Sequence, residues 1–158
     1  MRVLLDCRMA SWSGVGRYVT GLARALAARA DVELIEVCAT GETPPAAPGF
    51  LVRTASASRS PLSLRGAAEL STLIGKVKPD LVHCPQFPTP LTVQVPLVVT
   101  LQDLIPLVFT ASMPSVAKRL VYRLWNARAV NAADRLIVPS QATAHDVTRF
   151  FPSAQSKL

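Results

Sequence analysis

The chain has 158 residues, of which 50% are hydrophobic, and its mean hydropathy is +0.32. A chain of this length can bury its own core, and this apolar content excludes a disordered protein. The most apolar stretch, 93–101, is interrupted by Gln94 and Pro96, so it falls short of the ~20 apolar residues that a spanning helix needs. The N-terminus reaches Asp6 too soon to contain the hydrophobic region of a signal peptide. These observations predict a cytoplasmic protein.

The formal net charge is +7, and the basic residues are unevenly placed. Segments 7–30 and 104–133 contain no acidic residue. Their cations are Arg8, Arg17, Arg24 and Arg29 in the first, and Lys118, Arg119, Arg123 and Arg128 in the second. Such segments suit a phosphate-bearing ligand or an anionic membrane surface, and a merely solvated basic face explains them as well. Aromatic residues do not alternate with the cations and no nucleic-acid-binding module is recognisable, so we expect no nucleic acid partner.

The three cysteines, Cys7, Cys38 and Cys84, have no metal-ligand spacing. Two of them, Cys7 and Cys38, end predicted strands, where small buried thiols are common. We therefore expect reduced structural cysteines and no metal site.

In chain order, the first half alternates strand and helix patterns. Short apolar or alternating runs predict strands, and apolar residues at helical spacing predict a helix. The predicted strands are 2–6, 32–38 and 50–54, the predicted helix is 15–30, and the predicted loops are 9–14 and 40–48.

The second half continues the alternation after a polar segment, 56–63, that we expect to be mobile. A helix is predicted over 64–78 and is stopped by Pro79. Ser115 and Ser140 are predicted N-caps of two further helices, the last ending near residue 150. The helix after Ser115 carries Val116, Leu120, Leu124 and Ala127 on one face, and Arg and Lys on the other. The predicted strands are 81–83, 97–101 and 134–138, with a proline-rich loop over 84–90.

Strands that alternate with helices predict a parallel sheet with right-handed crossovers and helices on both faces, a Rossmann-like α/β fold. Ligands bind such sheets outside the carboxyl ends of the strands. The loops that leave those ends are predicted at 7–16, 84–90, 102–114 and 139–140.

Gly14 and Gly16 stand between the first strand and the first helix. Glycines there let the backbone approach a ligand, and the helix N-terminus offers N–H groups to a phosphate, with Arg17 beside it. The pattern is not G-x-G-x-x-G, since position 19 is Val, and no acid follows the second strand to bind a ribose. A dinucleotide site is therefore not expected, and turn glycines without a ligand are the alternative.

Gln102 and Asp103 follow the strand that ends near Leu101. The Asp103 carboxylate there can orient or deprotonate a hydroxyl, or else cap the loop that follows. For His83, neutral packing within its strand is favoured over catalysis. Four other groups are predicted to lie on the surface or in solvent-side turns: Asp80, Asp134, His145 and Asp146.

Five segments, in the order that the family has them, resemble the N-terminal domain of family 4 glycosyltransferases, in particular its mannosyltransferase-like branch. They are Arg2-Val-Leu-Leu-Asp-Cys-Arg8, Gly14-Val-Gly-Arg-Tyr18 running into Leu22-Ala-Arg-Ala-Leu26, Asp80-Leu-Val-His-Cys-Pro85, Val98-Val-Thr-Leu-Gln-Asp-Leu-Ile-Pro106 and Ala133-Asp-Arg-Leu-Ile-Val-Pro-Ser-Gln-Ala142. Each is weakly specific alone, but together they span nearly the whole chain.

The resemblance implies retaining transfer of a mannose-like hexose from a nucleoside diphosphate sugar, in a cleft between two Rossmann-like domains (the GT-B fold). The acceptor it implies is a saccharide or a lipid-linked saccharide, in polysaccharide or glycolipid assembly at the inner face of the membrane. Gly14 and Gly16 would face the diphosphate and acceptor, and Gln102 and Asp103 would face the transferred sugar as catalytic candidates. Arg17, His83 and Pro85 are further expected substrate contacts, and neither metal nor cofactor is implied.

Two departures from the family pattern qualify this expectation. The family typically has His at the position of Gln102, and an amide cannot carry a proton. The second departure is length. The resemblance assigns residues 1–150 to the acceptor-side domain and 151–158 to the start of a link to a donor-binding domain that this sequence does not include. The fragment alone is therefore expected to be inactive. The alternative is a non-catalytic Rossmann-like module that binds a phosphorylated ligand or an anionic membrane surface.

Overall fold

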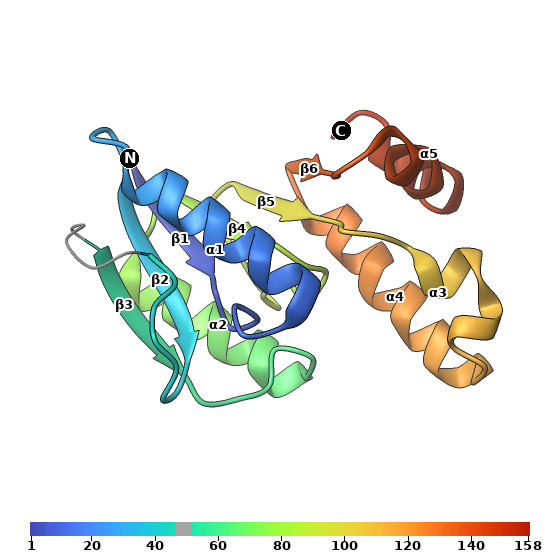
Figure 1. Cartoon of the computed structure of the whole chain (residues 1–158), viewed down its shortest axis with the longest axis horizontal. Helices are drawn as coiled ribbons and strands as arrows, with labels where there is room; N and C mark the ends of the chain where they lie inside the picture. The colour runs from blue at the N-terminus through green and yellow to red at the C-terminus, as the bar shows by residue number, and fades with distance from the viewer. Residues whose placement is uncertain (47–51) are drawn as a thin grey trace.

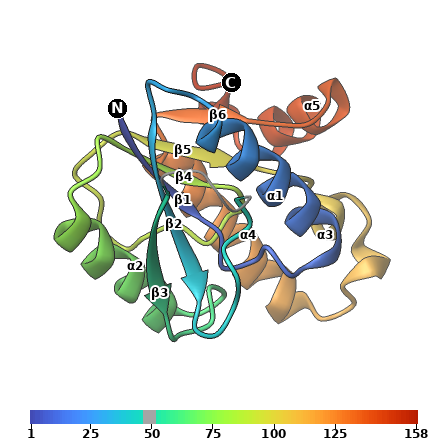
Figure 2. The same cartoon turned by 60° about the vertical axis from the view of Figure 1, so that its left-hand side comes forward.

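The computed structural model describes residues 1–46 and 52–158, and Figures 1 and 2 show it from two directions. Within these residues six parallel strands form one sheet in the order β3-β2-β1-β4-β5-β6. The strands are β1 (Arg2–Asp6), β2 (Glu33–Ala39), β3 (Val52–Ala57), β4 (Leu81–Cys84), β5 (Leu97–Thr100) and β6 (Arg135–Ile137). The helices are α1 (Ser13–Ala27), α2 (Leu64–Val77), α3 (Ile105–Val108), α4 (Val116–Ala132) and α5 (Gln141–Phe150), with single 3-10 turns at Thr110–Ser112 and Pro152–Ala154. The predicted Rossmann-like parallel sheet is confirmed.

Helices cover the two faces of the sheet unequally. On one face, α1 packs Val19 and Ala23 against Leu5 of the central strand. On the other face lies the larger core, in which α2 and α4 pack against β1, β4 and β5, with Leu4 of β1 fully buried. Alternate residues of β1 thus serve opposite cores, as the pleat of a strand requires. No helix in the described part of the chain is long and apolar enough to cross a membrane.

Two carboxylates fasten the sheet at the amino ends of its strands. Asp80 accepts a hydrogen bond from the Arg2 backbone N–H at 2.7 Å, and Asp134 accepts one from the Leu97 N–H at 2.8 Å. Both residues are exposed, as predicted for solvent-side turns. Because they lie at the edge opposite the carboxyl ends of the strands, they take no part in a site there.

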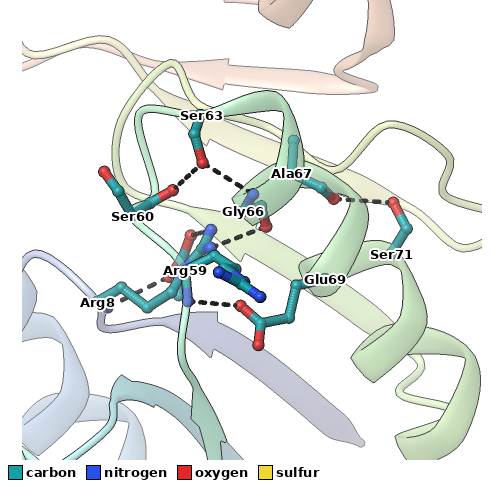
Figure 3. Close-up of polar contacts among 9 residues, drawn as sticks. Arg8, Arg59, Ser60, Ser63, Gly66, Ala67, Glu69 and Ser71 are labelled. Atoms are coloured by element: carbon teal, nitrogen blue, oxygen red, sulfur yellow. Dashed lines mark hydrogen bonds and ion pairs between the residues drawn. The ribbon is translucent and has the colours of Figure 1, made fainter.

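Several element boundaries differ from the sequence predictions. The first helix begins at Ser13, so Gly14 and Gly16 lie in its first turn rather than in a loop. The third strand runs from Val52 to Ala57, and the predicted start of that strand at Phe50 lies outside the described residues. The segment expected to be mobile is instead part strand and part anchored turn. The Ser58 N–H donates to the Glu69 carboxylate at 2.9 Å, and so does the Arg59 N–H, also at 2.9 Å (Figure 3).

Helix α4 presents its apolar side outward. Its buried residues are Asn126, Ala129 and Val130, in its second half. Val116, Leu120 and Leu124, the predicted apolar face, are all more than half exposed. An amphipathic helix ordinarily turns that face to the core, so this arrangement needs its own explanation.

A buried ion pair holds the end of β1. The Arg8 guanidinium donates from Nε and Nη2 to the two carboxylate oxygens of Asp6 at 2.7 and 2.6 Å, and neither side chain is more than 6% exposed. The third nitrogen, Nη1, donates to the Gly66 carbonyl in the first turn of α2 at 3.0 Å (Figure 3). A side chain at Gly66 would overlap the Ser60 carbonyl, so glycine is required for this close approach. The pair therefore joins the end of the central strand to the first turn of α2.

We predict that Arg8→Met lowers the free energy of unfolding by about 3–5 kcal/mol, because it leaves a buried carboxylate without its cation. Arg29→Met is the matched control, since Arg29 forms the same two-bond pair with Asp31 two residues away, at 3.0 and 2.8 Å, but in solvent. It should leave stability unchanged. Urea unfolding of both variants checks this, and equal losses would contradict it. The double variant Asp6→Leu/Arg8→Met should recover most of the loss.

Candidate functional site

The crevice of this sheet opens between the carboxyl ends of β1 and β4. The chain leaves β1 toward β2 on one side and leaves β4 toward β5 on the other, so the strand order reverses between them. Ligands bind at such a switch point in open α/β sheets. The segments around it are the loop after β1, the start of α1, and the loops after β4 and β5 (Figures 1 and 2).

The N-terminus of α1 has no side-chain cap in the described part of the chain. Its N-cap residue is Trp12, which offers no acceptor, and its first turn contains no acid. The other three long helices are each capped by the hydroxyl of a serine that accepts a backbone N–H, namely Ser63, Ser115 and Ser140. Free N–H groups and the positive end of the helix dipole make the start of α1 suited to an anion.

The two glycines of this turn have different environments. A side chain at Gly16 would overlap the Ala10 carbonyl, and Gly16 donates its own N–H to the Trp12 carbonyl at 2.7 Å. Close packing of the preceding loop on α1 therefore requires glycine at position 16. Gly14 is exposed and has open space around its Cα, so a ligand can approach its backbone.

Arg17 lies apart from the other candidates. It lines a hollow of about 480 Å³ on the outer side of α1, together with Trp12 and Arg24. No residue from the loops after β4 or β5 lines this hollow. The structure thus places Arg17 beside the start of α1 but not in the group formed by His83, Pro85 and Gln102.

His83 is one end of a hydrogen-bonded chain beneath the crevice. Its Nε2 lies 2.8 Å from the Thr100 hydroxyl, which lies 2.9 Å from the hydroxyl of Tyr18 on α1. His83 is 6% exposed, and burial lowers its pKa from 6.5 to about 4. The imidazole of His83 is consequently uncharged at neutral pH. The two hydrogen bonds connect α1 to β4 and β5.

Gln102 and Pro85 meet at the carboxyl ends of neighbouring strands. The Gln102 amide Nε2 donates to the Pro85 carbonyl at 3.3 Å. Asp103 is exposed, and its Oδ1 accepts the N–H of Ile105, the first residue of α3, at 3.0 Å. The Asp103 carbonyl also accepts the hydroxyl of Tyr122 from α4 at 3.2 Å. One carboxylate oxygen thus holds the turn that leads into α3, and the side chain remains exposed.

Sequence reasoning did not single out Tyr18 or Thr100. The available signal was a hydroxyl residue, Thr100, at the end of an otherwise apolar strand. It could not name the partner, because the contact to Tyr18 depends on how α1 packs across the sheet.

The cysteines are buried and free, as expected. Burial, followed by the nearby Glu36 carboxylate, raises the pKa of Cys7 above its ordinary range. Burial also raises the pKa of Glu36, whose Oε1 accepts the Ala46 N–H at 3.0 Å. Among the described residues, no group of three or more His, Cys, Asp or Glu side chains is placed to hold a metal ion.

We predict a pH-dependent contribution of His83 to stability. Between pH 6.5 and about 4 the unfolded chain binds a proton that the folded chain does not, so the free energy of unfolding falls as pH falls through this window. The loss is about 3 kcal/mol at most. Unfolding at several pH values should show that His83→Asn removes this component, whereas His145→Asn, a change at the exposed histidine of α5, keeps it. A wild-type slope in His83→Asn would contradict the prediction.

Comparison with solved structures shows the same fold in glycosyltransferases. The sucrose-phosphate synthase from Thermosynechococcus elongatus is similar with a TM-score of 0.67 and 16% sequence identity, over 94% of this chain and 45% of the other. The lipopolysaccharide outer core galactosyltransferase WaaB, in its apo form, is similar with a TM-score of 0.55 and 12% identity, over 98% and 44%. The chain thus spans less than half the length of either protein.

No curated protein matches the sequence of this chain. The sequence profile of Glycosyltransferase Family 4, in contrast, matches residues 12–158, a span that includes the start of α1, the loops after β4 and β5 and the last helix. On that match, the chain belongs to Glycosyltransferase Family 4.

Proposed function

We propose that the chain is the acceptor-side, N-terminal domain of a retaining glycosyltransferase. The transferred group would be a mannose-like hexose from a nucleoside diphosphate sugar, and the acceptor a saccharide or lipid-linked saccharide in polysaccharide or glycolipid assembly. Residues 1–150 would form this domain and 151–158 the start of the link to a donor-binding domain. Family membership, and a fold that covers 45% and 44% of two larger transferases, support the proposal.

The observation that carries the proposal is the uncapped start of α1 at the switch point of the sheet. A serine caps each of the other long helices, but Trp12 occupies the corresponding position of α1. The N–H groups near Gly14 are therefore free to receive a diphosphate, whose leaving charge the helix dipole stabilises. Arg17 adds an exposed positive charge beside the start of α1, and we expect this half of the protein to need no metal for that task.

The loop after β5 would position the transferred sugar rather than exchange protons with it. Gln102 uses its Nε2 to reach the Pro85 carbonyl, which leaves the amide oxygen to accept a sugar hydroxyl. Asp103 keeps one carboxylate oxygen on the Ile105 N–H and turns the other toward solvent, where it can accept a second hydroxyl. His83 lies beneath and is neutral, so it contributes by holding α1 against β5 through Tyr18.

We expect Gly14→Asp to lower sugar transfer by the full-length protein at least tenfold, because a carboxylate at the start of α1 repels the diphosphate. The same carboxylate favours the helix N-terminus, so thermal stability should hold or rise. Two control variants are matched to this one. Gly14→Ala changes the same position without adding a charge. Gly21→Asp adds the same charge in the middle of α1, where open space also surrounds the Cα. Both should retain most of the transfer, measured over a panel of nucleoside diphosphate sugars with a lipid-linked saccharide fraction. Equal transfer in Gly14→Asp and Gly14→Ala would contradict the proposed diphosphate site.

A second substitution separates the two roles open to Asp103. Asp103→Asn keeps an oxygen for the Ile105 N–H but removes the charge, whereas Asp103→Ala removes both. If the carboxylate orients a sugar hydroxyl, both variants lose transfer, by about tenfold or more, and Asp103→Asn keeps the melting temperature of the wild type. Full transfer in Asp103→Asn would restrict Asp103 to holding the turn before α3. Absence of transfer from every donor by the folded wild type would favour a non-catalytic module that binds a phosphorylated ligand.

A further inference from the structure

The hollow on the outer side of α1 combines an exposed aromatic ring with two cations. It encloses about 480 Å³, a volume typical of small-ligand sites, and we call it the α1 hollow. Its walls are the first half of α1 and the loop that leads into it. Its lining includes Trp12, Ser13, Arg17, Thr20, Gly21 and Arg24.

Helical spacing places the two arginines on one side of α1. Arg17 and Arg24 are seven residues apart, which is almost two full turns, so they leave the helix about 10.5 Å apart along its axis. Gly21 lies between them and has open space around its Cα. The missing side chain leaves a notch between the two guanidinium groups, and a ligand can enter it.

Both arginines are available to an anion. Arg17 and Arg24 are exposed, and neither side chain makes a hydrogen bond or an ion pair with another residue that the structure describes. Arg29, five residues further along the chain, is in contrast paired with Asp31 at 2.8 Å. Segment 7–30 contains no acidic residue. An anion in the α1 hollow would therefore meet two cations that are not already neutralised by a salt bridge.

Trp12 forms the wall of the α1 hollow at the start of the helix. It is 43% exposed, although a tryptophan is ordinarily mostly buried. The loop around it is held in place, because the Ser11 hydroxyl donates to Oε1 of Glu42 at 2.8 Å. The apolar face of a sugar ring can pack on the exposed indole, and the hydroxyls of Ser13 and Thr20 can exchange hydrogen bonds with sugar hydroxyls.

We propose that the α1 hollow binds an acidic saccharide, a sugar chain that carries carboxylate or phosphate groups. One ring would pack on Trp12, and the guanidinium groups of Arg17 and Arg24 would each bind an anionic group through two hydrogen bonds. A nucleoside phosphate fits less well, because its charges are adjacent whereas the two arginines leave the helix about 10.5 Å apart. No residue of the loops after β4 or β5 lines this hollow, so the inference does not depend on sugar transfer.

The test is calorimetric titration of the purified protein with tetragalacturonate, its uncharged methyl ester and adenosine monophosphate. The acid should bind about tenfold or more tightly than either of the other two ligands. Arg17→Gln/Arg24→Gln should weaken binding of the acid about tenfold or more. Arg65→Gln/Lys76→Gln removes the same charge from exposed positions of α2 and should bind within about threefold of the wild type.

Four outcomes of these titrations would overturn the proposal. They are no binding of the acid, equal binding of acid and ester, tighter binding of the nucleotide, and equal losses in the two double variants. The last would show that net charge alone explains the binding.

A single substitution tests the notch between the arginines. Gly21→Asp places a carboxylate there without a steric clash, so it should weaken tetragalacturonate binding about tenfold or more. Gly75→Asp makes the same change at an exposed position of α2, also with open space around the Cα, and should bind as the wild type does. Circular dichroism checks that both variants fold, and equal binding by the two would contradict the proposed site. Because Gly21→Asp is expected to keep sugar transfer, failure of this proposal and failure of the proposed function are distinguishable.

The aromatic contact has its own readout. In a Trp125→Phe background Trp12 is the sole tryptophan, and its emission should change as tetragalacturonate binds. Trp12→Ala should weaken binding about fivefold, and Trp12→Phe, which keeps an aromatic ring, should recover most of that loss. Unchanged affinity in Trp12→Ala, or constant emission while calorimetry records binding, would rule out a sugar on the indole and with it the proposal.

Discussion

The buried pair of Asp6 and Arg8 is the interaction on which the geometry of this domain depends. It lies where the chain leaves the central strand, and its three hydrogen bonds use both carboxylate oxygens of Asp6 and the Gly66 carbonyl of α2. The loop that leads to α1 starts from this point, and so does the packing of α2 against the strand. Two charges out of water are stable only while they satisfy each other, so the arrangement allows little variation in the path of that loop.

Under the proposed function, the crevice would position a sugar rather than exchange protons with it. Gln102 cannot titrate, and burial keeps His83 neutral down to about pH 4. The loops would offer a set of oriented polar groups: free N–H groups at the start of α1, the Gln102 amide, and the carboxylate of Asp103. The two hydrogen bonds that link Tyr18, Thr100 and His83 hold these groups in fixed relative positions, because they join α1 to both strands that carry the loops. Preorganised dipoles of this kind stabilise a departing anion without reorganisation.

Helix α4 connects this crevice with the outer surface of the domain. Its Tyr122 hydroxyl donates to the Asp103 carbonyl, and its opposite side carries the exposed residues Val116, Leu120 and Leu124.

Local patterns in the sequence predict much of this fold. The alternation of apolar runs predicted the parallel sheet, and the caps at Ser115 and Ser140 were readable because a cap acts within three residues of its own position. The placement of the loops after residues 84 and 101 at one edge of the sheet followed as well, since parallel strands end at one edge. The start of α1 was missed because Trp12 carries no capping signal, and the pair of Tyr18 with Thr100, 82 residues apart, depends on how a helix crosses a sheet. The exposure of Val116, Leu120 and Leu124 on α4 was likewise decided only by tertiary structure: the sequence shows which side of a helix is apolar, whereas the core it meets belongs to distant segments.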